Sequence, residues 1–168
     1  MNNKVLLIGG AGYIGAVVIK HLLDKKYNVT CLDNLIYNNS YSLREFEKNN
    51  EFNFVFGDLR DDILTNELLN KCDAVIILAG LVGDPITKKY PIESALINDK
   101  GVKNVIDLCS KRNNKKFIFI STCSNYGLVG NNDIADENYD LNPLSDYAKH
   151  KVCYCCQAES DLRTCRSP

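Results

Sequence analysis

Short apolar runs alternate with amphipathic segments along most of the chain. The continuous apolar runs are typical of strands buried on both faces and predict five strands, at 4–8, 28–32, 51–56, 74–78 and 116–120. Apolar residues at helical spacing predict one helix that ends near residue 26, two helices at 61–70 and 92–112, and one helix that begins near residue 146. A polar stretch at 34–50 predicts a loop with a short helix. Because strand and helix alternate with short connections, the sequence predicts an α/β fold, a doubly wound parallel sheet with helices on both faces.

The last sixteen residues differ in composition from the rest of the chain. They keep only a weak helical pattern and contain four cysteines, Cys153, Cys155, Cys156 and Cys165. This spacing lacks the paired ligands of a structural zinc site, so we expect no metal there. We expect one folded unit at 1–152 and a divergent or truncated tail at 153–168. A change of reading frame near Val152 would produce such a tail, and a short divergent terminus is the alternative.

The composition of the 168 residues fits one domain with a sizeable core. A net charge of −1 gives no electrostatic case for binding nucleic acid or an anionic membrane. No apolar run approaches the roughly 18–20 residues of a membrane span, and the first residues lack a signal-peptide pattern, so we expect a cytoplasmic protein. Four cysteines are scattered singly, which predicts buried thiols rather than disulfides: Cys31, Cys72, Cys109 and Cys123.

A glycine-rich stretch, Gly9–Gly15, joins the first strand to the first helix and reads as G-x-x-G-x-x-G or, from Gly10, as G-x-G-x-x-G. Glycines there permit a tight turn, close approach of a pyrophosphate and close helix–strand packing, while the helix N-terminus attracts phosphates. Asp33 ends the second strand, where a carboxylate hydrogen-bonds a ribose 2′-hydroxyl and repels a 2′-phosphate. These features predict an NAD site, and the alternative is a structural turn that binds no dinucleotide.

Two further positions lie at predicted strand ends. Asp58 follows the third strand, where its carboxylate either caps the helix that begins near Asp61 or hydrogen-bonds the adenine amino group. Leu78-Ala79-Gly80 ends the fourth strand with small residues. Small residues permit a cofactor to approach the carboxyl edge of the sheet closely.

Tyr147 and Lys151 are four residues apart on one face of the last predicted helix. A tyrosine has an ordinary pKa near 10, and a nearby lysine together with an oxidised nicotinamide ring would lower this pKa. Thr122 follows the fifth strand, where its hydroxyl can hydrogen-bond a substrate oxygen. The three residues indicate interconversion of an alcohol and a ketone, in which Tyr147 moves the proton and the cofactor takes the hydride. The alternative is an exposed helix face with a chance spacing.

Together and in order, these motifs resemble those of extended short-chain dehydrogenases/reductases in the NAD-dependent epimerase/dehydratase family, which includes UDP-glucose 4-epimerase. The resemblance spans residues 4–152. It depends on five stretches, Gly9–Gly15, Leu32–Leu35, Gly57–Arg60, Ser121–Gly127 and Tyr147–Lys151. Asn98 also matches the family's helix asparagine. Ile8 replaces a threonine often found there, and Cys123-Ser124 replaces the Asp-Glu pair of sugar 4,6-dehydratases, which disfavours dehydration.

The resemblance implies a Rossmann-type fold that lacks the family's C-terminal substrate domain, with NAD as the cofactor. It implies catalytic roles for Thr122, Tyr147 and Lys151. The cofactor contacts that it implies are those of Gly9, Gly12, Tyr13, Ile14, Gly15, Asp33, Asn34, Asp58, Leu59, Leu78, Ala79, Gly80, Asn98, Tyr147 and Lys151.

For a full-length form, the resemblance implies NAD-dependent epimerisation or a related oxidoreduction of a nucleotide sugar. Two alternatives stay open: a truncated NAD-binding module without turnover, and a reductase of a non-sugar carbonyl. Family members commonly form homodimers through the helices that correspond to 92–112 and to the one from 146. We expect the altered tail to shorten the second helix, which leaves a homodimer possible but not required.

Overall fold

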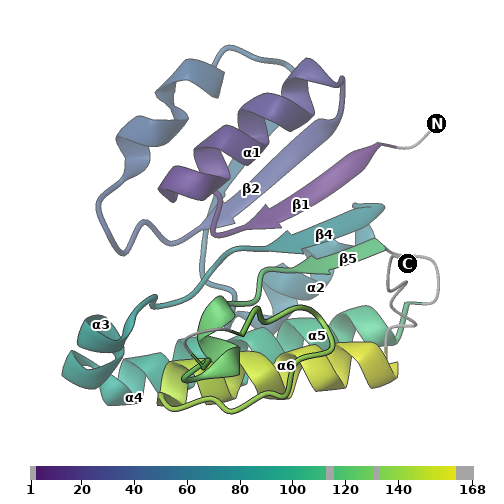
Figure 1. Cartoon of the computed structure of the whole chain (residues 1–168). Helices are drawn as coiled ribbons and strands as arrows, with labels where there is room; N and C mark the ends of the chain where they lie inside the picture. The colour runs from purple at the N-terminus through teal and green to yellow at the C-terminus, as the bar shows by residue number, and fades with distance from the viewer. Residues whose placement is uncertain (1–2, 113–115, 131–132, 162–168) are drawn as a thin grey trace.

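A five-stranded parallel sheet forms the centre of the fold (Figure 1). The computed structural model describes residues 3–112, 116–130 and 133–161. The strand order is β3-β2-β1-β4-β5. The strands are β1 (Lys4–Ile8), β2 (Asn28–Asp33), β3 (Phe52–Phe56), β4 (Ala74–Ile77) and β5 (Lys116–Phe119). All five predicted strands are confirmed, because strands buried on both faces have continuous apolar runs that are easy to recognise.

The helices are α1 (Tyr13–Asp24), α2 (Asp62–Asn70), α3 (Asp84–Lys89), α4 (Pro91–Ser94), α5 (Val102–Ser110) and α6 (Asp146–Asp161). Two 3₁₀ turns, η1 (Ser40–Phe46) and η3 (Cys123–Tyr126), and a π-helical segment, η2 (Ala95–Gly101), complete the elements. The predicted loop with a short helix at 34–50 is confirmed by η1.

Side chains alternate between the two faces of the sheet and so create two cores. Leu6, Ile8, Val75 and Ile77 pack with α2 and α5 in one core. Val5, Leu7 and Ile76 pack with α1 and η1 in the other. Helices therefore cover both faces, as the alternation of elements predicts (Figure 1).

The helical region before β5 differs from the prediction of one helix at 92–112. α4, η2 and α5 follow one another from Pro91 to Ser110, and the middle segment has π-helical bonding. The additional helix α3 has Pro85 in its first turn. Apolar periodicity alone does not distinguish π-helical from α-helical bonding.

Past Val152, α6 continues to Asp161, so it has 16 residues. Among the cysteines with described side chains, Cys31, Cys72 and Cys109 are buried as predicted, whereas Cys123 is exposed. The prediction for Cys123 was wrong because this residue lies in η3, beyond the covered part of β5. Within the described ranges, no helix is long and apolar enough to span a membrane, and no group of side chains could hold a metal ion.

Candidate cofactor and active site

The glycine turn between β1 and α1 is required by packing at two positions. Gly9 has φ +84°, and a Cβ there would overlap the backbone of Ala79. A Cβ on Gly15 would overlap the backbone of Gly10, so α1 can pack against the β1 end only with glycine at this position. The turn therefore holds the start of α1 directly above the carboxyl edge of β1.

Gly12 differs from these two glycines because packing does not require it. A Cβ on Gly12 would meet only the Gly9 carbonyl oxygen, at 3.6 Å. Gly12 is the N-cap of α1 and supplies no capping side chain, whereas Asp61 caps α2 by accepting a 3.0 Å hydrogen bond from the Leu64 N–H. The first-turn N–H groups of α1 are therefore left for an external anion, as a pyrophosphate site requires.

Asp33 joins the end of β2 to the glycine turn. Its Oδ2 accepts a hydrogen bond from the Ala11 N–H at 3.0 Å, and its Oδ1 accepts one from the Leu35 N–H at 2.8 Å. The Ala11 carbonyl oxygen accepts hydrogen bonds from Asn39 Nδ2 at 2.8 Å and Ser42 Oγ at 2.6 Å. Motif reasoning missed Asn39 and Ser42 because they lie in an ordinary polar stretch without a spacing signal.

Asp58 forms an ion pair instead of capping a helix. Its carboxylate accepts hydrogen bonds from Arg60 Nη2 at 2.7 Å and Nε at 2.8 Å, and from Asn34 Nδ2 at 2.9 Å. The helix-cap alternative is wrong because Asp61 caps α2. The hydrogen bonds from Arg60 are the main cause that lowers the pKa of Asp58 to about 2, so this carboxylate is ionised at neutral pH.

Asn98 holds the loop that follows β4. Its side chain is buried, and its Oδ1 accepts a hydrogen bond from the Leu81 N–H at 2.8 Å. Its Nδ2 donates to the Leu81 carbonyl oxygen at 2.8 Å and to Ser94 Oγ at 3.2 Å. Asn98 lies in the π-helical segment, and such segments are common at functional sites. The expected site residue Asn98 thus positions the segment that contains Ala79 and Gly80.

Lys151 lies one turn after Tyr147 on α6, and its side chain is buried. Its Nζ donates a 2.7 Å hydrogen bond to the Ile120 carbonyl oxygen, just after β5. The same Nζ lies 4.3 Å from the ring centroid of Phe119 and 5.9 Å from that of Tyr147. A small cavity beside these residues is also lined by Ala79 and Asn98. The structure therefore brings predicted residues from α6, η2 and the β4 end together.

The pKa of Tyr147 differs from the sequence-based expectation. Burial raises this pKa, and the nearby Tyr13 and Cys123 raise it further. The Lys151 ammonium, which donates to the Ile120 carbonyl oxygen, does not reverse this rise in the ligand-free chain. A lowered pKa therefore needs a positive charge beyond those that the protein itself supplies.

Thr122 lies at the carboxyl end of β5, as predicted, but its hydroxyl is directed to its own turn. Thr122 Oγ1 accepts a hydrogen bond from the Ser124 N–H and donates one to Ser124 Oγ, each at 3.3 Å. It is the N-cap of η3. These bonds are long, so the hydroxyl can turn toward a substrate oxygen at low cost.

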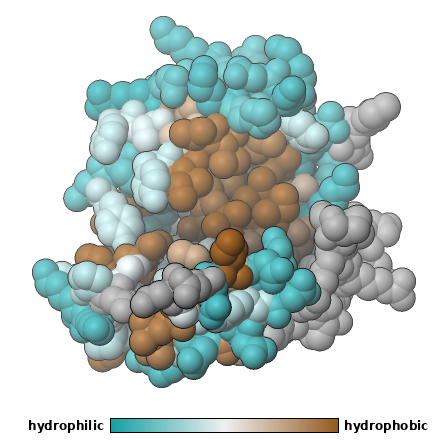
Figure 2. Space-filling model, in the orientation of Figure 1, coloured by the Kyte–Doolittle hydropathy of each residue, from teal (hydrophilic) through white to brown (hydrophobic). Residues whose placement is uncertain are grey.

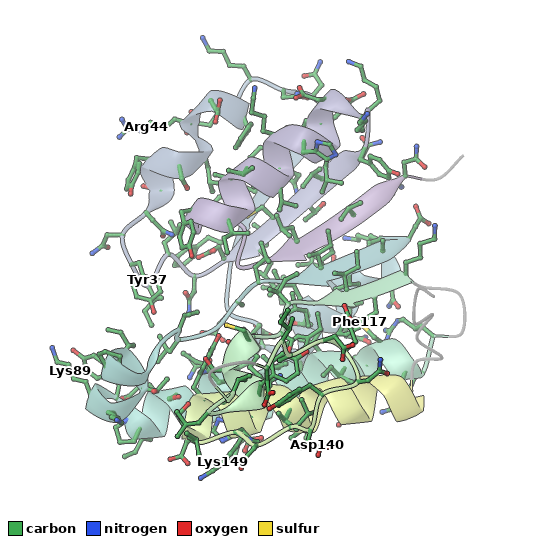
Figure 3. The ribbon with its side chains drawn as sticks, in the orientation of Figure 1. Tyr37, Arg44, Lys89, Phe117, Asp140 and Lys149 are labelled. Atoms are coloured by element: carbon green, nitrogen blue, oxygen red, sulfur yellow. The ribbon has the colours of Figure 1, made fainter. Side chains whose placement is uncertain are left out.

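Figure 3 shows how these elements surround the carboxyl edge of the sheet. The loop that carries Tyr37 lies on one side of it, and α3 with Lys89 and α6 with Lys149 lie on the other. The glycine turn, Asp33, the β4 end and α6 all border this edge. In parallel α/β sheets this edge is where ligands bind.

The family model described as "NAD dependent epimerase/dehydratase family" matches residues 5–160. A UDP-glucose 4-epimerase from Yersinia enterocolitica is 37% identical over 130 residues, which are 74% of this chain and 38% of that protein. One from Lactobacillus helveticus is 30% identical over 151 residues, 89% of this chain and 44% of that protein.

Two solved structures are similar over nearly the whole chain. The UDP-Glc/GlcNAc 4-epimerase from Campylobacter jejuni is 26% identical with a TM-score of 0.86, covering 96% of this chain and 49% of that one. A UDP-glucuronic acid 4-epimerase from Bacillus cereus, in complex with UDP-glucuronic acid and NAD, is 26% identical with a TM-score of 0.85. The match covers 96% of this chain and 52% of that one. The chain thus spans about half the length of these proteins.

Proposed function

The chain belongs to the NAD dependent epimerase/dehydratase family, and we propose that it is the cofactor-binding and proton-transfer part of an NAD-dependent nucleotide-sugar epimerase. The observation that carries this proposal is the placement of Tyr147 and the buried Lys151 at the same sheet edge as the uncapped N-terminus of α1. One end of this edge fits a pyrophosphate, and the other has a phenol that can exchange a proton.

The residues present fit NAD. Gly12 leaves the first-turn N–H groups of α1 open to the pyrophosphate, and Tyr13 and Ile14 supply those groups. Asp33 places a carboxylate at the end of β2, which favours a ribose 2′-hydroxyl over a 2′-phosphate. Asn34, Asp58 and Leu59 lie at the adenine end of such a site, and Leu78, Ala79, Gly80 and Asn98 lie at the nicotinamide end. When bound, NAD supplies a hydride acceptor and a positive charge.

Tyr147 takes up the proton of a sugar hydroxyl in this proposal and later returns it. Its phenol must first ionise, and burial opposes that step. Lys151 helps by holding a buried ammonium near the ring, fixed through the Ile120 carbonyl oxygen. Thr122 donates its hydroxyl hydrogen to the sugar oxygen as charge develops there.

The relatives named above support a nucleotide sugar as the substrate, because they are 4-epimerases of UDP-sugars. Cys123 and Ser124 lack the carboxyl groups that water elimination would use, which favours epimerisation over dehydration. The assignment of residues 1–152 to the cofactor-binding unit, with 153–168 as a tail, remains our proposal, as does a homodimer through α5 and α6.

A second candidate function is an NAD-binding module without turnover. The specific observation in its favour is that the chain spans only about half the length of the similar epimerases.

A two-step experiment separates these functions. NAD is first titrated into the chain, and the complex is then given UDP-glucose, UDP-galactose and UDP-glucuronic acid separately. Formation of the epimerised sugar supports the epimerase. The appearance of the absorbance of reduced nicotinamide also supports it, if Tyr147→Phe abolishes this signal. NAD binding without either signal favours the module, and activity that persists in Tyr147→Phe would refute the role given to that phenol.

A further inference from the structure

Bonds from neighbouring groups occupy the whole carboxylate of Asp58. Its Oδ1 accepts hydrogen bonds from the Arg60 backbone N–H at 2.9 Å and from Arg60 Nε at 2.8 Å. Its Oδ2 accepts from Arg60 Nη2 at 2.7 Å and from Asn34 Nδ2 at 2.9 Å. An ionised carboxylate offers about four lone-pair positions, and these bonds use all of them. A further donor therefore binds Asp58 only by displacing one that is already there.

The strand order places Asp58 at the base end of the proposed NAD site. The glycine turn follows β1, Asp33 ends β2 beside it, and Asp58 follows β3 on the far side of β2. The Gly57 N–H donates to the Asp33 carbonyl oxygen at 3.1 Å, which keeps the ends of β2 and β3 together. A ribose held by Asp33, with its phosphates at the glycine turn, therefore directs its purine toward Asp58. The bond expected from the sequence, from the adenine amino group to Asp58, has to compete with Arg60.

Arg60 holds Asp58 more strongly than an adenine amino group does. Its guanidinium makes two bonds to the carboxylate, and each joins opposite charges, whereas the amino group of adenine is a neutral donor. The side chain of Asp58 is only 25% exposed, so water is partly excluded from the pair. The hydrogen bonds from Arg60 are also the main cause that lowers the pKa of Asp58 to about 2. Arg60 therefore stays in place when a purine arrives.

We propose that Arg60 determines the base specificity of this site: by occupying Asp58, it makes the chain indifferent to the 6-amino group of the purine. The ligand class is then nicotinamide purine dinucleotides, with or without that amino group. Base recognition of this kind rests on the proposed function, because it requires NAD at this edge of the sheet.

The test measures by calorimetry the affinity of the full chain for NAD and for the NAD analogue in which unsubstituted purine replaces adenine, so that only the amino group is removed. We expect the two affinities of the unaltered chain to agree within about threefold. Arg60→Ala frees two positions on Asp58, and NAD should then bind at least about tenfold more tightly than the analogue. Arg60→Lys keeps the charge but lacks the planar fork, so it should shift the preference in the same direction by less. It serves if the alanine variant does not fold.

Two control variants separate this effect from general charge and from stacking elsewhere. Arg44→Ala removes one positive charge from an exposed position on η1 and should leave the preference unchanged. Figure 2 shows an apolar surface in the middle of the molecule, where a flat base can also stack. Ile118 of β5 is 49% exposed, and β5 is separated from β3 by β2, β1 and β4. Ile118→Ser should therefore leave the binding of both dinucleotides unchanged.

A second readout follows Arg60 itself. In nitrogen–proton NMR spectra, the Arg60 Nε–H signal is assigned by its loss in Arg60→Ala. This signal should keep its position when NAD saturates the unaltered chain, because the bond to Asp58 stays in place.

Three results would overturn the proposal: NAD binding to the unaltered chain at least about tenfold more tightly than the analogue, a preference that Arg60→Ala does not raise, or loss of the Arg60 Nε–H signal on NAD binding. The proposed function is judged separately, by whether the unaltered chain binds NAD at all. Without saturable NAD binding both fail, whereas saturable binding together with any of these three results removes the base specificity alone.

Discussion

Asn98 hydrogen-bonds both backbone polar groups of Leu81, accepting from its N–H and donating to its carbonyl oxygen, each at 2.8 Å. These two bonds fix the loop after β4 to the π-helical segment before α5. Because Ala79 and Gly80 immediately precede Leu81, the arrangement also fixes the floor of the proposed nicotinamide site. One buried amide therefore links the stability of the fold to the shape of the site.

Asn98→Ala should lower the free energy of unfolding by about 2–3 kcal/mol, because it leaves the buried Leu81 N–H and carbonyl oxygen unpaired. Urea unfolding monitored by circular dichroism measures this change. Asn104→Ala is the matched control, since the Asn104 amide bonds Asp62 at an exposed position and its loss should cost under about 0.5 kcal/mol. Equal costs for the two variants would contradict the role given to Asn98.

Gly12→Asp should separate cofactor binding from stability. An aspartate at the N-cap can accept hydrogen bonds from the first-turn N–H groups of α1, so thermal stability should stay equal or rise slightly. The same carboxylate occupies and repels the pyrophosphate, so NAD affinity should fall at least about a hundredfold. Gly12→Ala is the control, because its Cβ has room beside the Gly9 carbonyl oxygen. Undiminished NAD binding by the stable aspartate variant would show that the pyrophosphate does not bind there.

The Arg60–Asp58 pair predicts a specific pH dependence. The pKa of Asp58 is lowered to about 2 in the folded chain and is about 3.9 when unfolded, so the stabilisation is present above pH ~4 and is lost as the pH falls toward 2. Arg60→Ala should return the pKa of Asp58 toward its ordinary value, as measured by carbon NMR of the carboxyl group. It should also reduce stability at pH 6 more than at pH 2. A pKa that does not move in this variant would mean that Arg60 is not the main cause.

The Tyr147 phenol should titrate above the ordinary value near 10 in the ligand-free chain, because burial, Tyr13 and Cys123 all oppose its ionisation. The folded chain then holds a proton that the unfolded chain has lost, so this residue's contribution to stability falls as the pH rises past 10. Difference absorbance between the unaltered chain and Tyr147→Phe measures the pKa. Adding NAD should lower it. A ligand-free value at or below 10 would contradict the burial argument.

The sequence predicted the sheet well and the helical details less well. Runs such as Val5–Ile8 and Ala74–Ile77 are buried on both faces, so composition alone marks them as strands. The π-helical segment at 95–101 was missed because apolar periodicity does not distinguish π-helical from α-helical bonding, and its Asn98 contacts Leu81, 17 residues earlier in the chain. Local periodicity contains no record of such a partner.

The candidate site was also predicted only in part. Motif spacing placed Gly9, Asp33 and Lys151 at one edge because strand ends in a parallel sheet meet there. It could not predict that Lys151 donates to the Ile120 carbonyl oxygen, or that burial raises the pKa of Tyr147. Both effects depend on the packing of α6 against β5.

Calorimetric titration of the chain with NAD and, in parallel, with NADP measures whether the carboxyl edge of the sheet binds this cofactor. We expect saturable 1:1 binding of NAD, at least about tenfold weaker binding of NADP, and loss of most of this preference in Asp33→Ala. No saturable NAD binding, or NADP binding as tight as NAD in the unaltered chain, would contradict this expectation.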